Sequence, residues 1–505
     1  MKIDGAYAAF KAVAWFVAVS FLCPSHASAQ SDSSDDVLKG LKAPASAERP
    51  WQQPDMTGFA GVIKAKGEME ADPQKDYDLA GLIDLAESAN PETKVAWEQA
   101  KQAAAAVGLA QSEYFPILAL NASADYTREP VPVPESATTA GYLDLKTEQA
   151  QPVATLEWVL LDFGRRKSGV LAAKNQLLAA NLGFNTQHQQ IVFNVQSAFY
   201  EYCKARGRID VAQSALNSAL KVQQAAEERF KNGLATAPDV SQARQQAVAA
   251  AFDLEDVRAK ERDAQVVLAE TIGITPTVPL HVMDFSKLSV PTNLEDTVEQ
   301  VIDRTLKQRP DLMAQVAILR EKEAEIRQAR TAYYPTLAFE GEAGGSFDNS
   351  QMKFAGNTLP WSSTQQPVWG VGLSLTWSWF DGGSRKHKLE MAKAARAAAQ
   401  HALEDSRDKA ISQVWQAYTD TKLAISRLAV ATALVDASEK SYQQTFEAYQ
   451  NGLSSLVDVL SARRELSQAR YTQLDTRATL LESAAALAFA SGDLGPQLLE
   501  RKFGN

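Results

Sequence analysis

Residues 369–377 read Trp-Gly-Val-Gly-Leu-Ser-Leu-Thr-Trp, and this stretch decides the fold. Large apolar side chains occupy every second position from Trp369 to Trp377, and the positions between them carry glycine, serine or threonine. Because successive side chains of a β-strand point to opposite faces of the sheet, a period of two predicts a strand. We therefore expect a sheet with one apolar face and one polar face.

Three other stretches alternate in the same way, at 118–126, 154–160 and 337–343. Their polar face includes four carboxylates, namely Asp125, Glu157, Glu340 and Glu342. A soluble sheet with one wet face would also give this pattern. Strand lengths near ~9 to 11 residues, aromatic residues at the strand ends and an amino-terminal leader favour a membrane barrel. In such a barrel the carboxylates line the lumen, and the open pore should favour cations.

Four strands are too few to close a membrane barrel, since the smallest ones use about eight. The chain must therefore pool its strands with copies of itself, and we expect a homo-oligomer. The polar stretches 127–152 and 346–367 lie between paired strands and contain several prolines. They are predicted to be long outer loops.

Two long stretches rich in alanine, glutamine, leucine and lysine, 165–231 and 385–450, predict helices of roughly 100 Å each at 1.5 Å per residue. Shorter helical stretches flank them, and two short helices laid end to end match one long helix. This arithmetic predicts a two-layered helical rod. Ala-rich helices that are polar all round suit a hollow assembly that is wet on both surfaces, although an exposed coiled-coil stalk is an alternative.

Each long helix ends in a similar turn. Tip residues of the first turn are Asn232, Gly233 and Leu234, and those of the second are Asn451, Gly452, Leu453 and Ser454. The glycines suit the left-handed conformation that ends a helix. After each turn, a hydroxyl residue precedes an aspartate by three positions, at Asp239 and Asp458, which is the spacing of a helix-capping box. Both turns are predicted to be tips of helical hairpins.

The whole pattern occurs twice in the chain. Equivalent positions, such as Pro116 and Pro335 or Asp162 and Asp381, are always separated by the same number of residues, which we call the repeat offset. This period is too long for a solenoid and indicates a duplicated unit. We divide the chain into a signal peptide (1–29), a flexible extension (30–78), a first repeat (79–273), a linker (274–309), a second repeat (310–492) and a tail (493–505). The repeats contain hairpins 117–162 and 336–380, long helices 165–231 and 385–450, tips 232–236 and 451–455, and helices 237–272 and 456–490.

Residues 1–29 combine two lysines, an apolar run and a small-residue ending, which is typical of a secretory signal peptide. We expect cleavage after Ala29 rather than lipid attachment at Cys23, because a bulky leucine precedes that cysteine. Cleavage removes two of the 51 basic and one of the 61 acidic residues and leaves 49 against 60. This acidic balance argues against a nucleic-acid partner. Only Cys203 then remains, so no internal disulfide can form.

The motifs together resemble one family. Asn-Pro-Glu at 90–92, Tyr-Phe-Pro at 114–116, Phe-Asp-Gly at 380–382, both Asn-Gly-Leu tips and Ser-Gly-Asp-Leu at 491–494 occur in the order and spacing of the TolC-like outer-membrane efflux proteins. The resemblance implies a mixed α+β membrane fold. It would be a homotrimer with a 12-stranded β-barrel in the outer membrane of a Gram-negative bacterium. A periplasmic α-barrel of 12 helices continues it, with an equatorial belt drawn from 274–309 and the tail.

The same resemblance implies a passive exit duct of a tripartite export system. Its partners would be a periplasmic adaptor (membrane fusion) protein, docked at the tips, and an inner-membrane transporter. The duct would carry small toxic molecules. A type I protein secretion system is the alternative within the family, and a periplasmic structural coiled-coil protein is the alternative outside it.

Gate residues are also assigned by resemblance. Asp458 matches the aspartate whose threefold ring constricts the family's tunnel, and Ser461 occupies the position of a second aspartate there. Tyr449 and Asp239 match a pair that links adjacent hairpins and holds the gate shut. The arginine that joins this pair in the family corresponds to Ser454, so we expect a different latch in this chain.

An enzyme is the least favoured class. The cleaved chain would keep four histidines without ligand spacing, and the sequence shows no nucleophile motif and no phosphate loop. We therefore expect no catalytic residue, no metal site and no cofactor.

Overall fold

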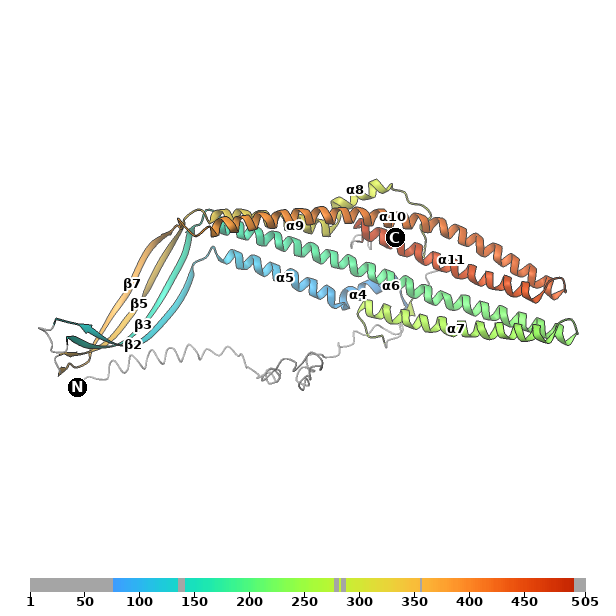
Figure 1. The fold of residues 1–505 in the computed structure, drawn as a ribbon, viewed down its shortest axis with the longest axis horizontal. Helices are drawn as coiled ribbons and strands as arrows, with labels where there is room; N and C mark the ends of the chain where they lie inside the picture. The colour runs from blue at the N-terminus through green and yellow to red at the C-terminus, as the bar shows by residue number, and fades with distance from the viewer. Residues whose placement is uncertain (1–75, 135–140, 277–280, 283–287, 355–356, 495–505) are drawn as a thin grey trace. The chain divides into compact units, whose positions relative to one another are not determined.

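The computed structural model describes residues 76–134, 141–276, 281–282, 288–354 and 357–494. The predicted signal peptide, most of the predicted extension and the tail beyond Leu494 lie outside these ranges. The described residues form two compact units, one built around a β-sheet and one built from helices. Figure 1 labels their elements.

Helices of equal length recur at the repeat offset. The pairs are α4 (Leu79–Ala89) and α8 (Val298–Gln308) with 11 residues, α5 (Pro91–Ser112) and α9 (Pro310–Thr331) with 22, α6 (Arg165–Lys231) and α10 (Ser384–Gln450) with 67, and α7 (Ala237–Ile272) and α11 (Leu456–Ser491) with 36. Helix α8 lies inside the range that the sequence assigned to a linker. The second series of elements therefore begins before residue 310.

The sheet contains four long antiparallel strands in the order β2 (Ile117–Pro132), β3 (Tyr142–Leu161), β5 (Thr336–Phe354) and β7 (Ser362–Thr376). A short strand, β6 (Asn357–Thr358), pairs with the end of β5. Within the described chain, β2 pairs only with β3 and β7 pairs only with β5. Both outer edges of the sheet are thus open for further pairing.

The prediction of long loops at 127–152 and 346–367 was wrong, because most of these residues extend the strands. Strand β2 pairs with β3 along its whole length as far as Pro132. Arg128 donates from Nε and Nη2 to both carboxylate oxygens of Asp144, at 2.8 and 2.7 Å, so polar side chains bind across the strands. Within the chain β2 is an edge strand, so the prolines near its end interrupt no second ladder of the same sheet.

The strand register gathers the large apolar side chains on one face. Trp158 on β3 pairs with Phe339 on β5, and Phe339 pairs with Leu373 on β7. Directly opposed residues of antiparallel strands share a face. The aromatic and aliphatic side chains of the decisive stretch remain exposed, and Trp369 keeps 76% of its surface. The sheet thus presents a broad apolar surface to its surroundings.

Each strand-to-helix junction contains the same ion pair. The Oδ2 atom of Asp162 accepts from the backbone N–H and the Nε of Arg166, at 2.9 and 2.7 Å. The Oδ2 atom of Asp381 accepts in the same way from Arg385, at 2.9 and 2.9 Å. Each aspartate binds an orphan N–H group at the start of a long helix, where a negative charge is also favoured by the helix dipole. The chain direction therefore changes identically at both junctions.

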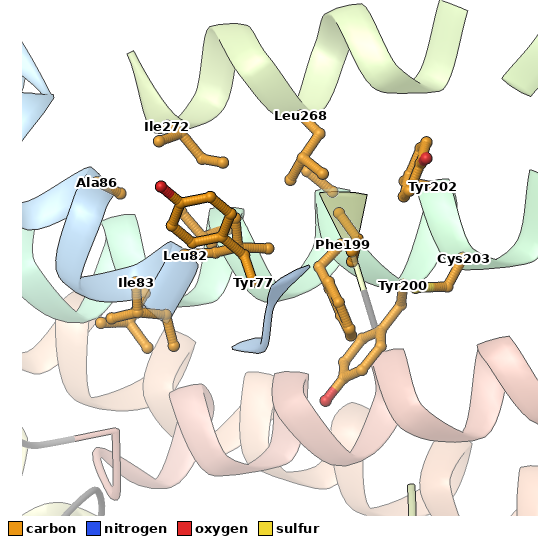
Figure 2. Packing of buried hydrophobic residues seen from close by; sticks show 14 of the residues in the cluster. Tyr77, Leu82, Ile83, Ala86, Phe199, Tyr200, Tyr202, Cys203, Leu268 and Ile272 are labelled. Carbon is orange, nitrogen blue, oxygen red and sulfur yellow. The ribbon is translucent and has the colours of Figure 1, made fainter. Parts of the chain in front are cut away.

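The largest core cluster lies in the helical unit, where α4, α6 and α7 meet (Figure 2). Leu82, Phe199 and Leu268 are each at most 2% exposed there. Tyr77 also packs into this cluster and belongs to a short strand, β1 (Asp76–Tyr77), which pairs in parallel with β4 (His281–Val282). The prediction that all of 30–78 is flexible was wrong at its end, because burial of Tyr77 holds this segment.

None of the helices in the described ranges combines the length and the apolar composition needed to cross a bilayer.

Candidate functional site at the helical tips

Two tight turns close the helical hairpins, and their backbones are alike. Gly233 has a φ of 76° and Gly452 has a φ of 79°, so both adopt the left-handed conformation that glycine permits. The next amide reaches back to the helix, since Leu234 donates to the carbonyl of Arg229 and Leu453 donates to that of Ala448, both at 2.8 Å. These bonds are those of a Schellman motif. Both leucines project outward, and Leu453 is 83% exposed.

A capping box begins the helix after each turn, as the residue spacing predicted. The Oδ2 atom of Asp239 accepts from the backbone N–H and the hydroxyl of Thr236, at 2.9 and 2.7 Å. The Oδ2 atom of Asp458 accepts from the backbone N–H and the hydroxyl of Ser455, at 3.0 and 2.6 Å, and from the hydroxyl of Ser454 at 3.2 Å. Hydrogen bonds to the ionised form, chiefly from these hydroxyls, lower the pKa of both carboxyl groups.

Arg229 joins the two tips within one chain. Its Nη1 donates to the backbone carbonyls of Tyr449 and Gln450 at the end of α10, and its Nη2 donates to the carbonyl of Leu234 at 3.2 Å. Its guanidinium carbon also lies 4.9 Å from the centre of the Tyr449 ring. A cation at a helix carboxyl end binds orphan carbonyls and complements the helix dipole. The guanidinium of α6 thus caps α10.

The tip link that the resemblance implied differs in this chain. Tyr449 is only 3% exposed, and burial raises the pKa of its phenol. Among the described residues, its hydroxyl has no hydrogen-bond partner. No hydrogen bond joins it to Asp239 within the described residues, where one oxygen of that carboxylate accepts from Thr236. Tyr449 instead contributes its ring and its carbonyl to Arg229.

An apolar cluster lies behind this contact and holds the two hairpins together. Val222, Ala226 and Val459 are fully buried in it, and Tyr442 and Phe446 pack against it. The side chains of the cluster come from α6, α7, α10 and α11. Burial of this surface stabilises the pair of hairpins by the hydrophobic effect, and Arg229 adds directional bonds at its end.

The remaining predicted residues fall into two places. The hydroxyl of Ser461 donates to Glu465 at 3.3 Å, one turn beyond Asp458 on α11. On the sheet, Glu157 pairs with Glu340, Glu342 pairs with Thr155 and Asp125 pairs with Gln149. This register puts all four predicted carboxylates on the face opposite the apolar one.

Two arginines were missed by the sequence reasoning. Arg229 acts on residues about 220 positions away along the chain, and Arg463 on α11 is 6% exposed and donates to Gln246 on α7 at 3.1 Å. Neither belongs to a local motif. For Arg229 the one signal was a difference between the repeats, since the corresponding residue of the second repeat is Ala448. Arg463 gave no such signal, because its counterpart in the first repeat is also an arginine, Arg244.

Several known proteins are similar to this chain over most of its length, and three of them illustrate the range. Protein CyaE of Bordetella pertussis is 27% identical over 434 residues, which are 85% of this chain and 87% of that protein. The toluene efflux pump outer membrane protein TtgC of Pseudomonas putida is 24% identical over 387 residues, 76% of each chain. The solved outer-membrane channel OprN has the same fold, with a TM-score of 0.70 and 22% identity over 88% of this chain and 98% of that one.

A family model described as outer membrane efflux protein matches the chain twice. The first match covers residues 82–274 and the second covers residues 301–493, so both ends of the second lie one repeat offset after those of the first. Each match contains one complete helical hairpin with its tip. This chain belongs to the outer membrane efflux protein family.

Proposed function

We propose that this protein is the passive exit duct of a tripartite export system. Three copies assemble a 12-stranded barrel in the outer membrane and a 12-helix tunnel in the periplasm, and each chain derives from an internal duplication. The observation that supports this most directly is the sheet, which has four strands, two open edges, one broad apolar face and one acidic face. Three such sheets joined edge to edge give a closed barrel with an apolar exterior.

The cargo in this proposal is a small toxic molecule. The supporting similarity is to TtgC, whose name describes a toluene efflux pump. Energy comes from an inner-membrane transporter, and a periplasmic adaptor joins it to the tips. The exposed Leu234 and Leu453, with their Asn-Gly turns, present two equivalent apolar points in each chain for that adaptor.

Membrane fractionation and planar-bilayer recording test the proposed function. We expect a heat-resistant trimer in the outer-membrane fraction. We also expect a cation-selective pore, because Glu157, Glu340, Glu342 and Asp125 would line its lumen. A soluble periplasmic protein would contradict the proposed duct, and a reversal potential that shows anion preference would contradict the assignment of the lumen.

In this duct, Asp458 forms the constriction. A threefold ring of carboxylates concentrates negative charge on the axis and attracts multivalent cations. One carboxylate oxygen of Asp458 accepts the capping bonds, and no hydrogen bond to its other oxygen is found among the described residues. The second oxygen can therefore face an ion while the first caps the helix.

Replacing Asp458 with Ala should abolish most of the block of single-channel current by multivalent cations in planar bilayers. Hydrogen bonds from Ser455 and Ser454 lower the pKa of Asp458 in the single chain, so the capping box favours the ionised carboxylate at neutral pH, where the block should be recorded. Asp239→Ala is the matched control, since it removes the same kind of capping box from the other tip. Equal loss of block in both variants would attribute the effect to capping instead of a ring.

A further inference from the structure

Contacts inside the two repeats follow the repeat offset at the level of single atoms. The indole N–H of Trp158 donates to the carbonyl of Tyr114 at 3.0 Å, and that of Trp377 donates to the carbonyl of Tyr333 at 3.2 Å. The ion pairs at the two strand-to-helix junctions repeat in the same way. Equivalent positions therefore make equivalent contacts, and this rule can be applied to contacts that join one repeat to the other.

One such contact joins α6 to α11. Arg208 donates from Nε and Nη2 to the two carboxylate oxygens of Asp475, at 3.1 and 2.7 Å. Its guanidinium carbon lies 5.8 Å from the centre of the Tyr471 ring. A bidentate, charge-assisted pair of this kind is specific in geometry, and the aromatic face adds to the binding of the cation. This trio joins the first hairpin to the second.

The counterparts of this trio keep its chemistry. A shift by the repeat offset changes Arg208 to Arg427, Asp475 to Asp256 and Tyr471 to Phe252. The arginine and the carboxylate are retained, and one aromatic residue replaces another. The same three kinds of side chain at equivalent positions point to a common role.

Within one chain, Arg427 contacts neither Asp256 nor Phe252. Phe252 on α7 is 74% exposed, although it is a large aromatic residue. Arg427 on α10 is exposed and has no ion pair or hydrogen bond among the described residues. Asp256 accepts from Lys260, four residues along its own helix, at 2.6 Å. The two halves of the second trio thus lie on α7 and α10, apart from each other.

Burial differs between the twin helices. Helix α11 has 14 buried residues and its twin α7 has 8. Helix α6 has 16 buried residues and its twin α10 has 7. Helices α6 and α11 cover each other where the two hairpins meet, whereas the equivalent faces of α7 and α10 are uncovered. If further copies extend the side-by-side packing of these hairpins, the α10 of one copy must pack against the α7 of the next copy.

We propose that a second copy of this chain binds here, with Arg427 of one copy on Asp256 and Phe252 of the next copy. The inference rests on the proposed trimeric duct and assigns the residues of its subunit interface. Three identical heterologous contacts of this kind close a ring. In that ring, contacts between hairpins within one chain alternate with contacts between neighbouring chains. Within a chain α6 packs on α11, and between chains their twins α10 and α7 pack on each other.

A second pair of positions supports the same occupant. Arg463 on α11 donates to the side-chain carbonyl of Gln246 on α7 within the chain, at 3.1 Å. The shift changes Arg463 to Arg244, which is exposed, and changes Gln246 to Glu465. Between copies, an arginine would thus meet a carboxylate instead of an amide. In each of these two predicted contacts, an arginine of one copy faces a carboxylate of the other. The α7 surface of one copy is therefore complementary in charge to the surface that α10 and α11 form on the next copy.

Cysteine crosslinking tests the interface. In the full-length protein, the double variant Asp256→Cys with Arg427→Cys should form a covalent trimer with a short bifunctional thiol reagent, because each cysteine faces its partner on a neighbouring copy across the span of an arginine side chain. Each single variant should remain uncrosslinked, and so should the out-of-register pair Asp256→Cys with Leu434→Cys. Cys203 is 3% exposed and should not contribute.

Charge exchange provides an independent measurement. Arg427→Asp should abolish the heat-resistant trimer, because it opposes two carboxylates, and Asp256→Arg should weaken it similarly. The double exchange should restore most of the trimer. A trimer in the outer membrane that shows neither crosslinking nor restoration would overturn the interface and leave the duct intact. A monomeric, soluble protein would overturn both.

Discussion

Replacing Gly344 with Val should eliminate the assembled protein from the outer membrane. Gly344 lies on β5 where β3 approaches most closely, and a Cβ atom there would lie 2.8 Å from the Cα of Val153 and closer still to the carbonyl oxygen of Pro152. Overpacking of a core usually costs about 1–3 kcal/mol, and it is absorbed by side chains. Here the obstacle is backbone, so β3 and β5 must separate.

The consequence of that separation is large because β3 and β5 join the two halves of the sheet. We expect the heat-resistant trimer of Gly344→Val to be nearly absent in gel analysis of outer-membrane fractions. Gly372→Val is the matched control, since Gly372 lies on the same face of β7 and a Cβ there meets no atom within 4 Å. Valine favours strands, so the control should assemble normally. Normal assembly of Gly344→Val would show that the close approach is not required.

Replacing Arg229 with Ala should open the tips and raise the resting conductance of the pore. The change removes the donors to the carbonyls of Tyr449, Gln450 and Leu234. A hydrogen bond from a charged donor contributes about 1.5–3 kcal/mol, and the carbonyls at the end of α10 would lose their cap. We expect a several-fold increase of the time-averaged current in planar bilayers at neutral pH.

Two variants separate this bridging role from charge alone. Arg229→Lys keeps the charge but lacks the planar fork that reaches several carbonyls, so it should leak to an intermediate extent. Lys231→Ala removes an exposed cation from the same tip and should leave the current unchanged. If Lys231→Ala leaks as much as Arg229→Ala, net charge at the tip, and not the bridge, controls closure.

Local patterns predicted the helices and the two tips well, because their causes are local. The hydroxyl and the carboxylate of a capping box are three residues apart, and a left-handed glycine ends its own helix. The strands were predicted too short, because the prolines near Pro132 were interpreted as loop residues. Whether a proline ends a strand depends on which edge has a neighbour, and that is a property of the sheet.

The contact between the tips could not be predicted from local patterns. Arg229 and Tyr449 meet because the ends of α6 and α10, two helices of equal length, lie together at the tips. The resemblance directed attention to Asp239 as the partner of Tyr449, yet among the described residues Asp239 accepts hydrogen bonds from Thr236 of its own capping box. Side chains that act across helices require the packing to be known.

The equal lengths of the paired helices also determine which genetic changes the protein tolerates. One residue inserted into a helix rotates everything beyond it by about 100° and moves it by about 1.5 Å. An insertion in α6 but not in α10 would turn Arg229 away from the end of its partner and misalign every contact on that side. We expect natural variants of this protein to differ in helix residues by substitution and to gain or lose residues at strand turns and in the connection before α8.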